Sequence, residues 1–355
     1  MQGPPDVLRR LAAEVDQQLT DALDRLLPRL VEVHPSLSAV AEELRAFVEG
    51  GKRIRPVLLL LGFEAAGGHT RSAVHGPALA LELLHTCALA HDDVIDRAPE
   101  RRGRPSVHHG FAARHRAAGW SGDPLGYGEA VAILIGDLAF VQADELFLSA
   151  RVPDRALLAA LRRFTVLREE VMVGQYLDLQ AATSRATDRD LALTVATLKS
   201  GRYSVARPLE IGAELAGADE AFLEGLRAFG DPLGRAFQVQ DDLLGVFGEQ
   251  ETTGKSASSD LAEGKRTLLV AEAAARLSPD DRAVLEAGLG DPDLSAERAA
   301  ELRELMVGCG AREATETYVR DAVSEARTAL EDLPLPRQAH AHLDALASYL
   351  GDRVS

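Results

Sequence analysis

The sequence predicts an all-α protein, a bundle of about 10–13 helices around a central cavity. Apolar residues recur at helical spacing along most of the 355 residues, and no stretch shows the alternation with a period of two that a half-buried strand requires. Hydrophobic residues make up 46% of the chain and charged residues 26%, which is ordinary for a globular protein. This length fits one large helical domain or two modest ones.

The expected helices follow one another with short interruptions. The Gly50-Gly51 pair ends the second of them, Pro56 is compatible with the first turn of the third, and the fourth is apolar until it ends in acid. We expect loops over residues 97–126, 248–264 and 288–294, of which the first two each follow an acid cluster. The first eight helices span residues 7–30, 37–48, 57–66, 77–96, 130–149, 154–182, 188–216 and 218–247, and three or four more follow Gly264.

Net charge, cysteines and apolar runs limit the class of protein. A net charge of −16 argues against a nucleic-acid partner, which would need a basic face. Cys87 and Cys309 lack metal-ligand spacing, so we expect free thiols and a reducing compartment. Residues 1–6 show no signal peptide and are expected to be flexible, and apolar runs such as 57–61 are too short to span a bilayer. We therefore expect a cytoplasmic protein with no integral membrane segment.

An acid cluster, Asp92-Asp93-Val94-Ile95-Asp96, ends the long apolar helix. Positions i and i+4 share a helix face, so Asp92 and Asp96 are expected to project together while Asp93 points aside. Carboxylates this close repel one another, and a hard cation such as Mg²⁺ relieves the repulsion. Taken alone, the cluster fits a solvated helix end equally well.

Two basic runs accompany this cluster. Downstream, Arg101 and Arg102 offer forked donors that match phosphate oxygens, and the alternative is ion pairing with Glu100 or with the aspartates. Upstream, three cations follow a flexible glycine pair in Gly50-Gly51-Lys52-Arg53-Ile54-Arg55. Such a segment can enclose an anion, although it is also typical of a solvated turn.

A second acid cluster, Asp241-Asp242, ends another apolar helix. Gly245 stands where a full DDxxD pattern carries its last acid. A glycine inside a helix costs about 1 kcal/mol relative to alanine, so another advantage is expected to favour it here. The polar loop that follows holds Lys255 and Lys265, which we expect to reach a diphosphate held between two clusters that face each other across an active site.

Together these motifs resemble those of the trans-prenyltransferases, the polyprenyl (isoprenyl) diphosphate synthase family, and within it the geranylgeranyl diphosphate synthases. The resemblance runs roughly from Gly50 to Thr267. It implies one isoprenoid synthase domain over residues 1–355 with the isoprenoid synthase type I fold, a homodimer, and three Mg²⁺ ions per active site. It rests on the segments GGKRIRP, ELLHTCALAHDDVIDRAPERRGRPSVH, GQYLDL, LKSGRYS, FQVQDDLLGVFG and TGKSASSDLAEGKRT.

The resemblance also implies roles for single residues. The metal ligands would be Asp92, Asp93, Asp96, Asp241 and Asp242. The allylic diphosphate would contact Arg101, Gln175, Lys199, Lys255 and Lys265. Isopentenyl diphosphate would contact Gly51, Lys52, Arg55, His85 and Arg102. The catalytic set would be Asp92, Asp96, Lys199, Ser200, Gln238 and Asp241. Ser200 stands at a position where many members have threonine. Gln175, Asp178 and Gln238 would help to position metals, water and substrate.

The reaction implied is the head-to-tail condensation of isopentenyl diphosphate with an allylic diphosphate. The allylic C–O bond ionises, the double bond of isopentenyl diphosphate attacks the cation, and a proton leaves. The protein supplies positioning, electrostatic stabilisation and a dry pocket.

Several of these residues have simpler explanations. His85 also fits a hydrogen-bonded core histidine, Asp178 a cap or salt-bridge partner, and Lys199 a surface lysine. For His91, His108 and His109 we expect ordinary polar contacts, with metal ligation as the alternative.

The product length is expected to depend on residues one or more turns before Asp92, since a helical turn rises about 5.4 Å, close to the length of an isoprene unit. Cys87 and Ala88 are small where shorter-product members often carry aromatics. We therefore expect the twenty-carbon geranylgeranyl diphosphate, with longer chains as the alternative. Leu84 comes next in the channel, followed by Leu81 and Ala80, which would either form a floor or let the tail through.

Two other functions compete with this one. Asp241, Gly245 and Glu249 resemble the second metal motif of class I terpene cyclases, but a cyclase does not need the basic set for isopentenyl diphosphate. A non-catalytic subunit that tunes a partner synthase usually loses the first cluster or the basic set, and both are intact here.

Overall fold

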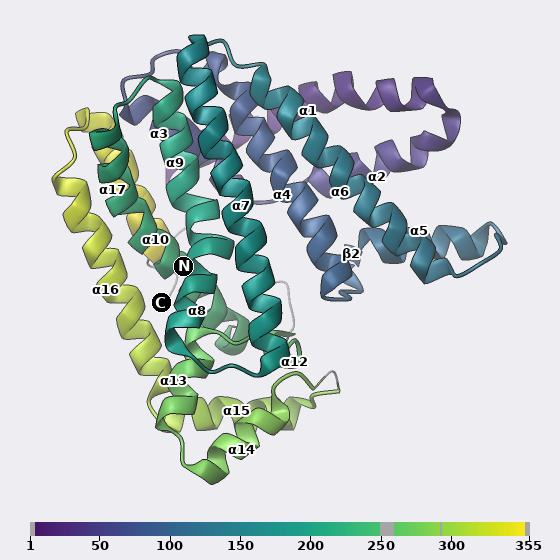
Figure 1. The fold of residues 1–355 in the computed structure, drawn as a ribbon, viewed down its shortest axis with the longest axis vertical. Coiled ribbons are helices and arrows are strands. Elements are labelled where there is room, and N and C mark those ends of the chain that lie inside the picture. The colour runs from purple at the N-terminus through teal and green to yellow at the C-terminus, as the bar shows by residue number, and fades with distance from the viewer. Residues whose placement is uncertain (1–3, 249–258, 292, 352–355) are drawn as a thin grey trace. The chain divides into compact units, whose positions relative to one another are not determined.

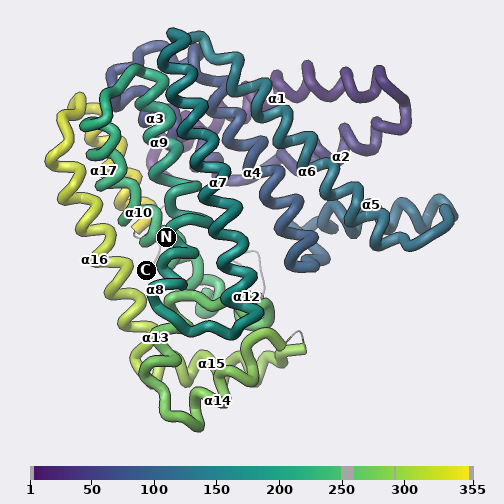
Figure 2. Tube along the Cα trace, viewed as in Figure 1, coloured from purple at the N-terminus to yellow at the C-terminus, as the bar shows by residue number. Residues whose placement is uncertain are grey.

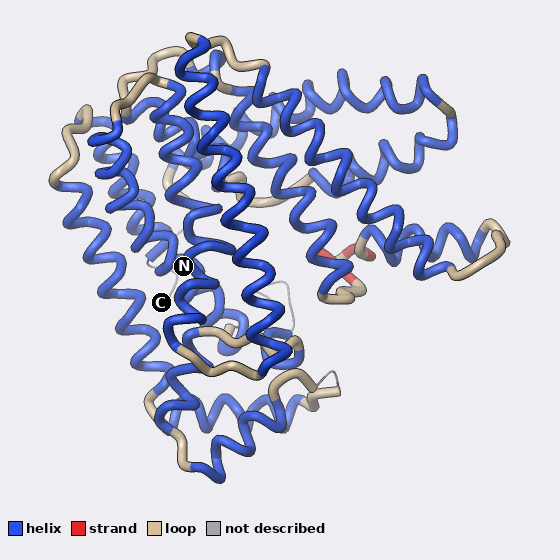
Figure 3. Tube along the Cα trace, in the orientation of Figure 1, coloured by secondary structure: helices blue, strands red, loops and turns tan. Residues whose placement is uncertain are grey.

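The computed structural model describes residues 4–248, 259–291 and 293–351, and these are almost entirely helical (Figure 3). The predicted all-α class is confirmed. Within these residues the strands are limited to β1 (Glu100–Arg101) and β2 (Arg104–Pro105), which pair antiparallel. None of the helices described is both long and apolar enough to cross a membrane.

Figure 1 gives the order of the helices along the chain. A π-helical segment, Ala196–Ala206, links α8 to α9, and short 3₁₀ turns precede α2 and α4 at Pro35–Leu37 and Arg71–Ala73. The helices are α1 (Asp6–Val33), α2 (Ser38–Val48), α3 (Ile54–Ala65), α4 (His75–Ile95), α5 (Val107–Ala117), α6 (Pro124–Leu148), α7 (Asp154–Ser184), α8 (Arg189–Val195), α9 (Arg207–Leu215), α10 (Glu220–Phe247), α12 (Ser259–Ala262), α13 (Leu268–Arg276), α14 (Pro279–Gly288), α15 (Ala296–Gly308), α16 (Ala311–Glu331) and α17 (Arg337–Gly351).

The chain forms two compact units. The N-terminal unit comprises Asp6–Leu60 and His69–Leu157, and the C-terminal unit comprises Leu61–Gly68 and the residues from Leu158 onwards. The boundary therefore falls inside α3 and near the start of α7. The first acid cluster belongs to the N-terminal unit and the second to the C-terminal unit, while the expectation of one domain over 1–355 stays a prediction.

In the N-terminal unit α4 packs along α6. Gly136 on α6 lets the two helices approach closely, since a Cβ atom there would lie 2.6 Å from Cδ2 of His91 on α4. This close packing holds the C-terminal end of α4, where the first acid cluster lies, against a rigid neighbour. The buried residues of α6 are Gly128, Ala132, Ile135, Gly136, Ala139, Ala143, Leu146 and Phe147.

In the C-terminal unit α10 is the central helix, flanked by α16, α17 and the π-helical segment (Figure 2). Asp219 caps its start by accepting a hydrogen bond from the backbone N–H of Phe222. Val239, Leu243 and Val246 enter the hydrophobic core that α10 shares with α13 and α16. Their burial fixes the rotation of the last turns of α10, and with it the direction in which the second acid cluster points.

Three expectations about the helices were wrong. The predicted loop 97–126 contains α5, whose buried Val107, Phe111 and His115 recur at i, i+4 and i+8. Its other residues are basic or small, which hid the period. Helix α6 begins six residues earlier than expected, because Asp123 accepts from two backbone N–H groups and Pro124 occupies the first turn. After Gly264 the described residues contain α13 to α17, more helices than predicted.

Candidate active site

The first acid cluster divides into one buried and two partly exposed carboxylates. Asp93 is fully buried, and Arg101 reaches its Oδ1 with Nε at 2.6 Å and Nη2 at 2.5 Å. Oδ2 of Asp92 lies 3.8 Å from Nη2 of the same guanidinium. Asp96 caps the end of α4, and its backbone N–H donates a hydrogen bond to the carbonyl of Asp92. The helix spacing thus separates Asp93 from Asp92 and Asp96, as the sequence indicated.

A second group in the N-terminal unit is basic. Arg102, which has a positive φ of 53°, donates from Nη1 to the carbonyl of Glu49 at 3.1 Å. Its Nη2 would lie 3.1 Å from a Cβ atom on Gly51, so the glycine lets the guanidinium lie against the backbone. Lys52 is exposed beside it, and Arg55 follows in the first turn of α3.

His85, on α4, lies among these cations. The pKa of His85 is well below its usual value because of burial first, and then because of Arg55, Arg102, Arg101 and Arg53. The fold therefore brings His85, Arg55 and Arg102 close enough to interact electrostatically. A neutral imidazole among guanidinium groups suits an anionic ligand, which would compensate the surplus positive charge.

Arg53 has a different role from its neighbours. Its side chain is buried, with Nε on Asp16 at 2.7 Å and Nη1 on Glu82 at 2.6 Å, and Nη2 donates to the carbonyl of Val48. These bonds tie the basic segment to α1, α2 and α4. Sequence reasoning did not single out Arg53, and the available signal was Glu82, a lone acid inside an apolar helix.

In the C-terminal unit Lys199 pairs with Asp178. The Lys199 ammonium lies 2.6 Å from Oδ2 of Asp178 on α7, and both side chains are mostly buried. A Cβ atom on Gly174 would lie 2.7 Å from Cα of Lys199, so α7 approaches the π-helical segment closely. Asp178 is thus a salt-bridge partner, and its partner is a predicted site residue. Gln175 and Ser200 are partly exposed.

An ion-pair network that sequence reasoning missed secures the π-helical segment. Arg202 binds Glu170 at 3.0 Å and Asp231 at 2.9 Å, which links the segment to α7 and α10. Arg207 binds Glu170 at 2.7 Å and the fully buried Glu210 at 2.6 Å. π-Helical turns are uncommon and occur often at functional sites, and here the segment carries Lys199 and Ser200.

The second acid cluster is also divided. Asp241 is exposed, whereas Asp242 is buried and accepts a hydrogen bond from Gln238 Nε2 at 2.7 Å. Burial raises the pKa of Asp242 to about 8, and the neighbouring carboxylate of Asp260 adds to the effect. Asp260 was not among the predicted site residues. It pairs with Lys265 at 2.8 Å.

Lys255 and Glu249, which sequence reasoning assigned to the allylic site and to the alternative cyclase motif, lie outside the described residues.

The donors in the two clusters fit magnesium by their chemistry. Asp92, Asp96 and Asp241 present carboxylate oxygens at or near the surface, and hard oxygen ligands are those that Mg²⁺ prefers, together with phosphate oxygens and water. Among the residues that the structure describes, no three acidic, histidine or cysteine side chains stand close enough to hold an ion by themselves.

The predicted chain-length residues line the inner part of α4. Cys87, Leu84 and Leu81 are buried and Ala88 is partly buried. The thiol of Cys87 lies 3.8 Å from Nδ1 of His91, and burial, with a contribution from Asp137, raises its pKa to about 12. His91 also reaches the carbonyl of Ile133 at 3.1 Å. It therefore makes ordinary polar contacts, as expected.

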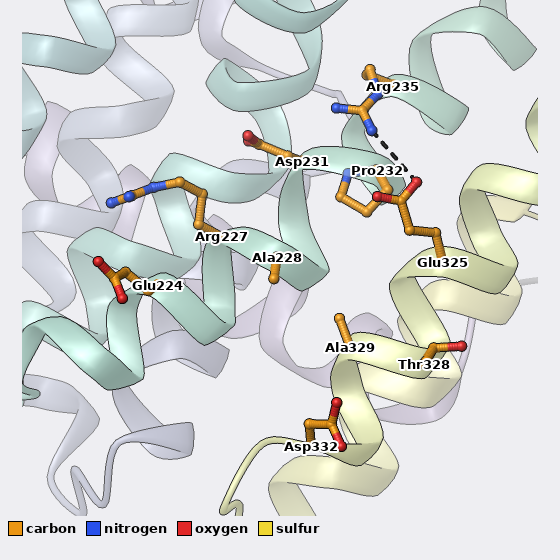
Figure 4. Close-up of a pocket in the computed structure, with 10 residues that line it drawn as sticks. All are labelled: Glu224, Arg227, Ala228, Asp231, Pro232, Arg235, Glu325, Thr328, Ala329 and Asp332. Atoms are coloured by element: carbon orange, nitrogen blue, oxygen red, sulfur yellow. Dashed lines mark ion pairs between the residues drawn. The ribbon is translucent and has the colours of Figure 1, made fainter.

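A pocket of about 690 Å³ opens between α10 and α16 (Figure 4). It contains none of the predicted site residues. Its charged side chains are four acids and two arginines, of which Arg235 and Glu325 form an ion pair at 3.7 Å. Because acids outnumber bases, this pocket does not suit a diphosphate.

Apolar helices that end in carboxylates, with Arg101 beside the first cluster and Lys265 near the second, define a class of protein: an all-α protein suited to metal-complexed diphosphates. The chain matches the polyprenyl synthetase family over residues 37–306, so it belongs to this family and is a prenyltransferase that makes trans-prenyl diphosphates. The predicted family and enzyme class are confirmed.

Its relatives differ in their products. A (2E,6E)-farnesyl diphosphate synthase from Mycobacterium bovis is 33% identical over 342 residues, which are 95% of this chain and 89% of that protein. A geranylfarnesyl diphosphate synthase from Aeropyrum pernix is 32% identical, over 86% of this chain and 91% of that protein. A crystal structure of geranylgeranyl pyrophosphate synthase from Corynebacterium glutamicum, complexed with isoprenyl diphosphate and magnesium, has 37% identity and a TM-score of 0.93, covering 98% of this chain and 99% of that one.

Proposed function

We propose that this prenyltransferase condenses isopentenyl diphosphate with an allylic diphosphate to form geranylgeranyl diphosphate in a Mg²⁺-dependent reaction. The observation that carries the proposal is the presence, in one unit, of two distinct groups. One is the acid cluster with Arg101, and the other is the basic group of Arg55, His85 and Arg102. A condensing enzyme needs a place for each of two diphosphates.

The allylic diphosphate is the substrate that needs a metal. When bound, Mg²⁺ neutralises the diphosphate that leaves as the allylic C–O bond ionises. Asp92, Asp96 and Asp241 would hold the metal, with three ions as the expected number. Asp93 and Asp242 are buried, which favours a supporting role for both, although they were predicted as ligands. Arg101, Lys199, Lys265 and Gln175 would contact the same diphosphate, and Ser200 and Gln238 would steady the cation and the site water.

Isopentenyl diphosphate would bind the basic group without a metal. Arg102 is already held by the backbone of Glu49, and Arg53 fixes the segment that carries Gly51, Lys52 and Arg55. Such preorganised donors lose little conformational entropy on binding. The neutral His85 can donate one hydrogen bond to an anion or take up a proton from solvent when the anion arrives.

The proposed product length rests on the small side chains below the first cluster. Cys87 and Ala88 leave room where a bulky residue would stop the tail, while Leu84 and Leu81 lie deeper in α4. The relatives carry names for shorter, equal and longer products, so this assignment stands on these residues, with a longer chain as the alternative.

A homodimer is proposed from the exposed face of α6. Leu134, Val141 and Leu148 are spaced seven residues apart and are 60%, 60% and 56% exposed. A stripe of this kind on a helix is typical of a helix–helix interface between copies. Sedimentation of the 38.0 kDa chain should give twice the monomer mass, and Val141→Glu should reduce it to one chain; a monomeric wild-type protein contradicts the proposal.

The free cysteines are consistent with action in the cytoplasm. Cys87 and Cys309 form no disulfide. Proteins of reducing compartments keep such thiols. Localisation of a tagged full-length chain in its own cells tests this, and an extracytoplasmic signal contradicts it.

Steady-state kinetics with both substrates test the division into two diphosphate sites. Arg102→Gln should raise KM for isopentenyl diphosphate by about tenfold or more with little change for the allylic substrate, because it removes a charge-assisted fork. Lys199→Gln should show the converse pattern. If each variant affected both substrates equally, the assignment would be wrong.

A further inference from the structure

Gly245 lies one helical turn after Asp241 on α10, and Asp260 fills the space beside it. A Cβ atom on Gly245 would overlap Oδ2 of Asp260 and would lie 2.7 Å from its Cγ. The carboxylate of Asp260 thus occupies the space in which any side chain at position 245 would begin. The glycine at the end of the shortened second motif is therefore a structural requirement of this contact.

The other oxygen of Asp260 holds Lys265. Oδ1 accepts a hydrogen bond from Lys265 Nζ at 2.8 Å, and the Asp260 carbonyl accepts one from the Lys265 backbone at 3.2 Å. Glu263 supplies a second carboxylate to the same ammonium at 2.7 Å. The side chain of Asp260 is 12% exposed and that of Lys265 25%, so the pair is largely shielded from water. Shielded ion pairs are stronger than ion pairs at the surface.

The turn that carries this pair is fixed by the core. Leu261 is buried, and its carbonyl accepts from the backbone of both Gly264 and Gly290. Gly264 has a φ of 71°, and a Cβ atom there would lie 3.0 Å from Cα of Gly290. Two glycines thus let the turn pack against the chain before α15, and the position of Asp260 is set by the fold.

We infer that the missing side chain of Gly245 makes room for the carboxylate of Asp260. From this position Asp260 acts as a positioning residue that holds the ammonium of Lys265 beside Asp242. The inference rests on the proposed function, in which Lys265 contacts the allylic diphosphate. Asp260 and Lys265 both lie close enough to Asp242 to act on its carboxyl group electrostatically.

Gly245 is therefore required by the position of Asp260 and is more than a lost metal ligand. Restoring the acid with Gly245→Asp would displace Asp260, release Lys265 and weaken the site. A side chain as small as alanine would have the same effect, since its Cβ atom alone overlaps the carboxylate.

Thermal unfolding tests the contact between Gly245 and Asp260 without any assumption about function. Glycine to alanine inside a helix normally stabilises a protein. Gly110→Ala on α5 is the control, because its Cβ atom would meet nothing within 4 Å, and it should raise Tm. Gly245→Ala should lower Tm in the wild type and raise it in the Asp260→Ala background. If Gly245→Ala raises Tm in both backgrounds, Asp260 does not occupy the space beside Gly245.

Calorimetric binding of inorganic pyrophosphate in the presence of Mg²⁺ tests the positioning role. Lys265→Ala should weaken binding about tenfold, the effect of losing one charge-assisted contact. Asp260→Ala and Gly245→Asp should weaken it by a similar factor, and Asp260→Ala/Lys265→Ala should bind no more weakly than Lys265→Ala. Unchanged or tighter binding by Asp260→Ala, or effects that multiply in the double variant, would overturn the role.

The two measurements separate failure of the inference from failure of the proposed function. A wild-type protein that binds no pyrophosphate with Mg²⁺ refutes the proposed function and the positioning role together. The Tm values of the variants still decide whether Gly245 makes room for Asp260. A wild-type protein that binds pyrophosphate, combined with an unaffected Asp260→Ala variant, refutes the positioning role alone.

Discussion

The guanidinium of Arg101 meets a single oxygen of Asp93 through two nitrogens, at 2.6 and 2.5 Å, and Asp93 has no exposed surface. The middle acid of the first cluster is therefore committed to an arginine, while Asp92 and Asp96 remain at the surface. The three acids of one motif are thus expected to differ in what their removal does.

Asp93→Asn should mainly destabilise the fold, whereas Asp92→Asn should mainly reduce kcat. Breaking a buried ion pair costs about 3 kcal/mol, since one charge stays buried without its partner. Urea unfolding and elongation rates at several Mg²⁺ concentrations measure the two effects. Equal stability of the two variants would show that Asp93 is not committed to Arg101.

Glu82→Gln should lower the free energy of unfolding by about 3 kcal/mol, because it leaves the buried guanidinium of Arg53 with less compensation. The matched control is Glu145→Gln, which breaks the exposed ion pair with Arg29 and should cost less than about 1 kcal/mol. Urea midpoints of both variants provide the comparison. A loss for Glu82→Gln no larger than for the control would remove Arg53 from its proposed anchoring role.

Stability should fall as the pH drops below about 6.5, and His85 should account for part of the loss. The pKa of His85 is lowered in the folded state by burial and by Arg55, Arg102, Arg101 and Arg53. Between the folded and unfolded values the unfolded chain binds more protons, so stability rises with pH there. His85→Gln should flatten this part of the curve when urea midpoints at pH 5.5 and 7.5 are compared. An unaltered slope would contradict the assigned environment.

Cys87→Phe should shorten the product by one isoprene unit, because the ring fills the space below the first cluster. Cys87→Ser keeps the volume and should leave the product length unchanged. Mass spectrometry of the extracted products measures both. Unchanged product length in Cys87→Phe would refute the argument from channel depth.

Short-range pattern was sufficient to predict which acids of the first cluster share a helix face. Asp92 and Asp96 are both partly exposed, as helical spacing predicted, while their role as metal ligands, like that of Asp241, stays a prediction. The same spacing correctly set Asp93 apart. Helix α5 escaped notice because its buried face includes two histidines, and its start at Ser106 lacks a side-chain capping bond.

Contacts between distant positions were beyond the sequence. Glu82 and Arg53 are 29 residues apart, and Asp260 lies 15 residues after Gly245, the glycine that makes room for its carboxylate. Sequence reasoning noted that Gly245 needed an explanation and offered none. The explanation depends on where the turn before Lys265 packs, which only the folded chain determines.

The central claim is most directly tested by the mass of the product that the purified full-length chain makes from isopentenyl diphosphate and dimethylallyl diphosphate with Mg²⁺. We expect a linear trans-prenyl diphosphate of twenty carbons, and no product when the metal is chelated. A cyclised hydrocarbon from a single substrate, or no turnover until a second protein is added, would contradict it.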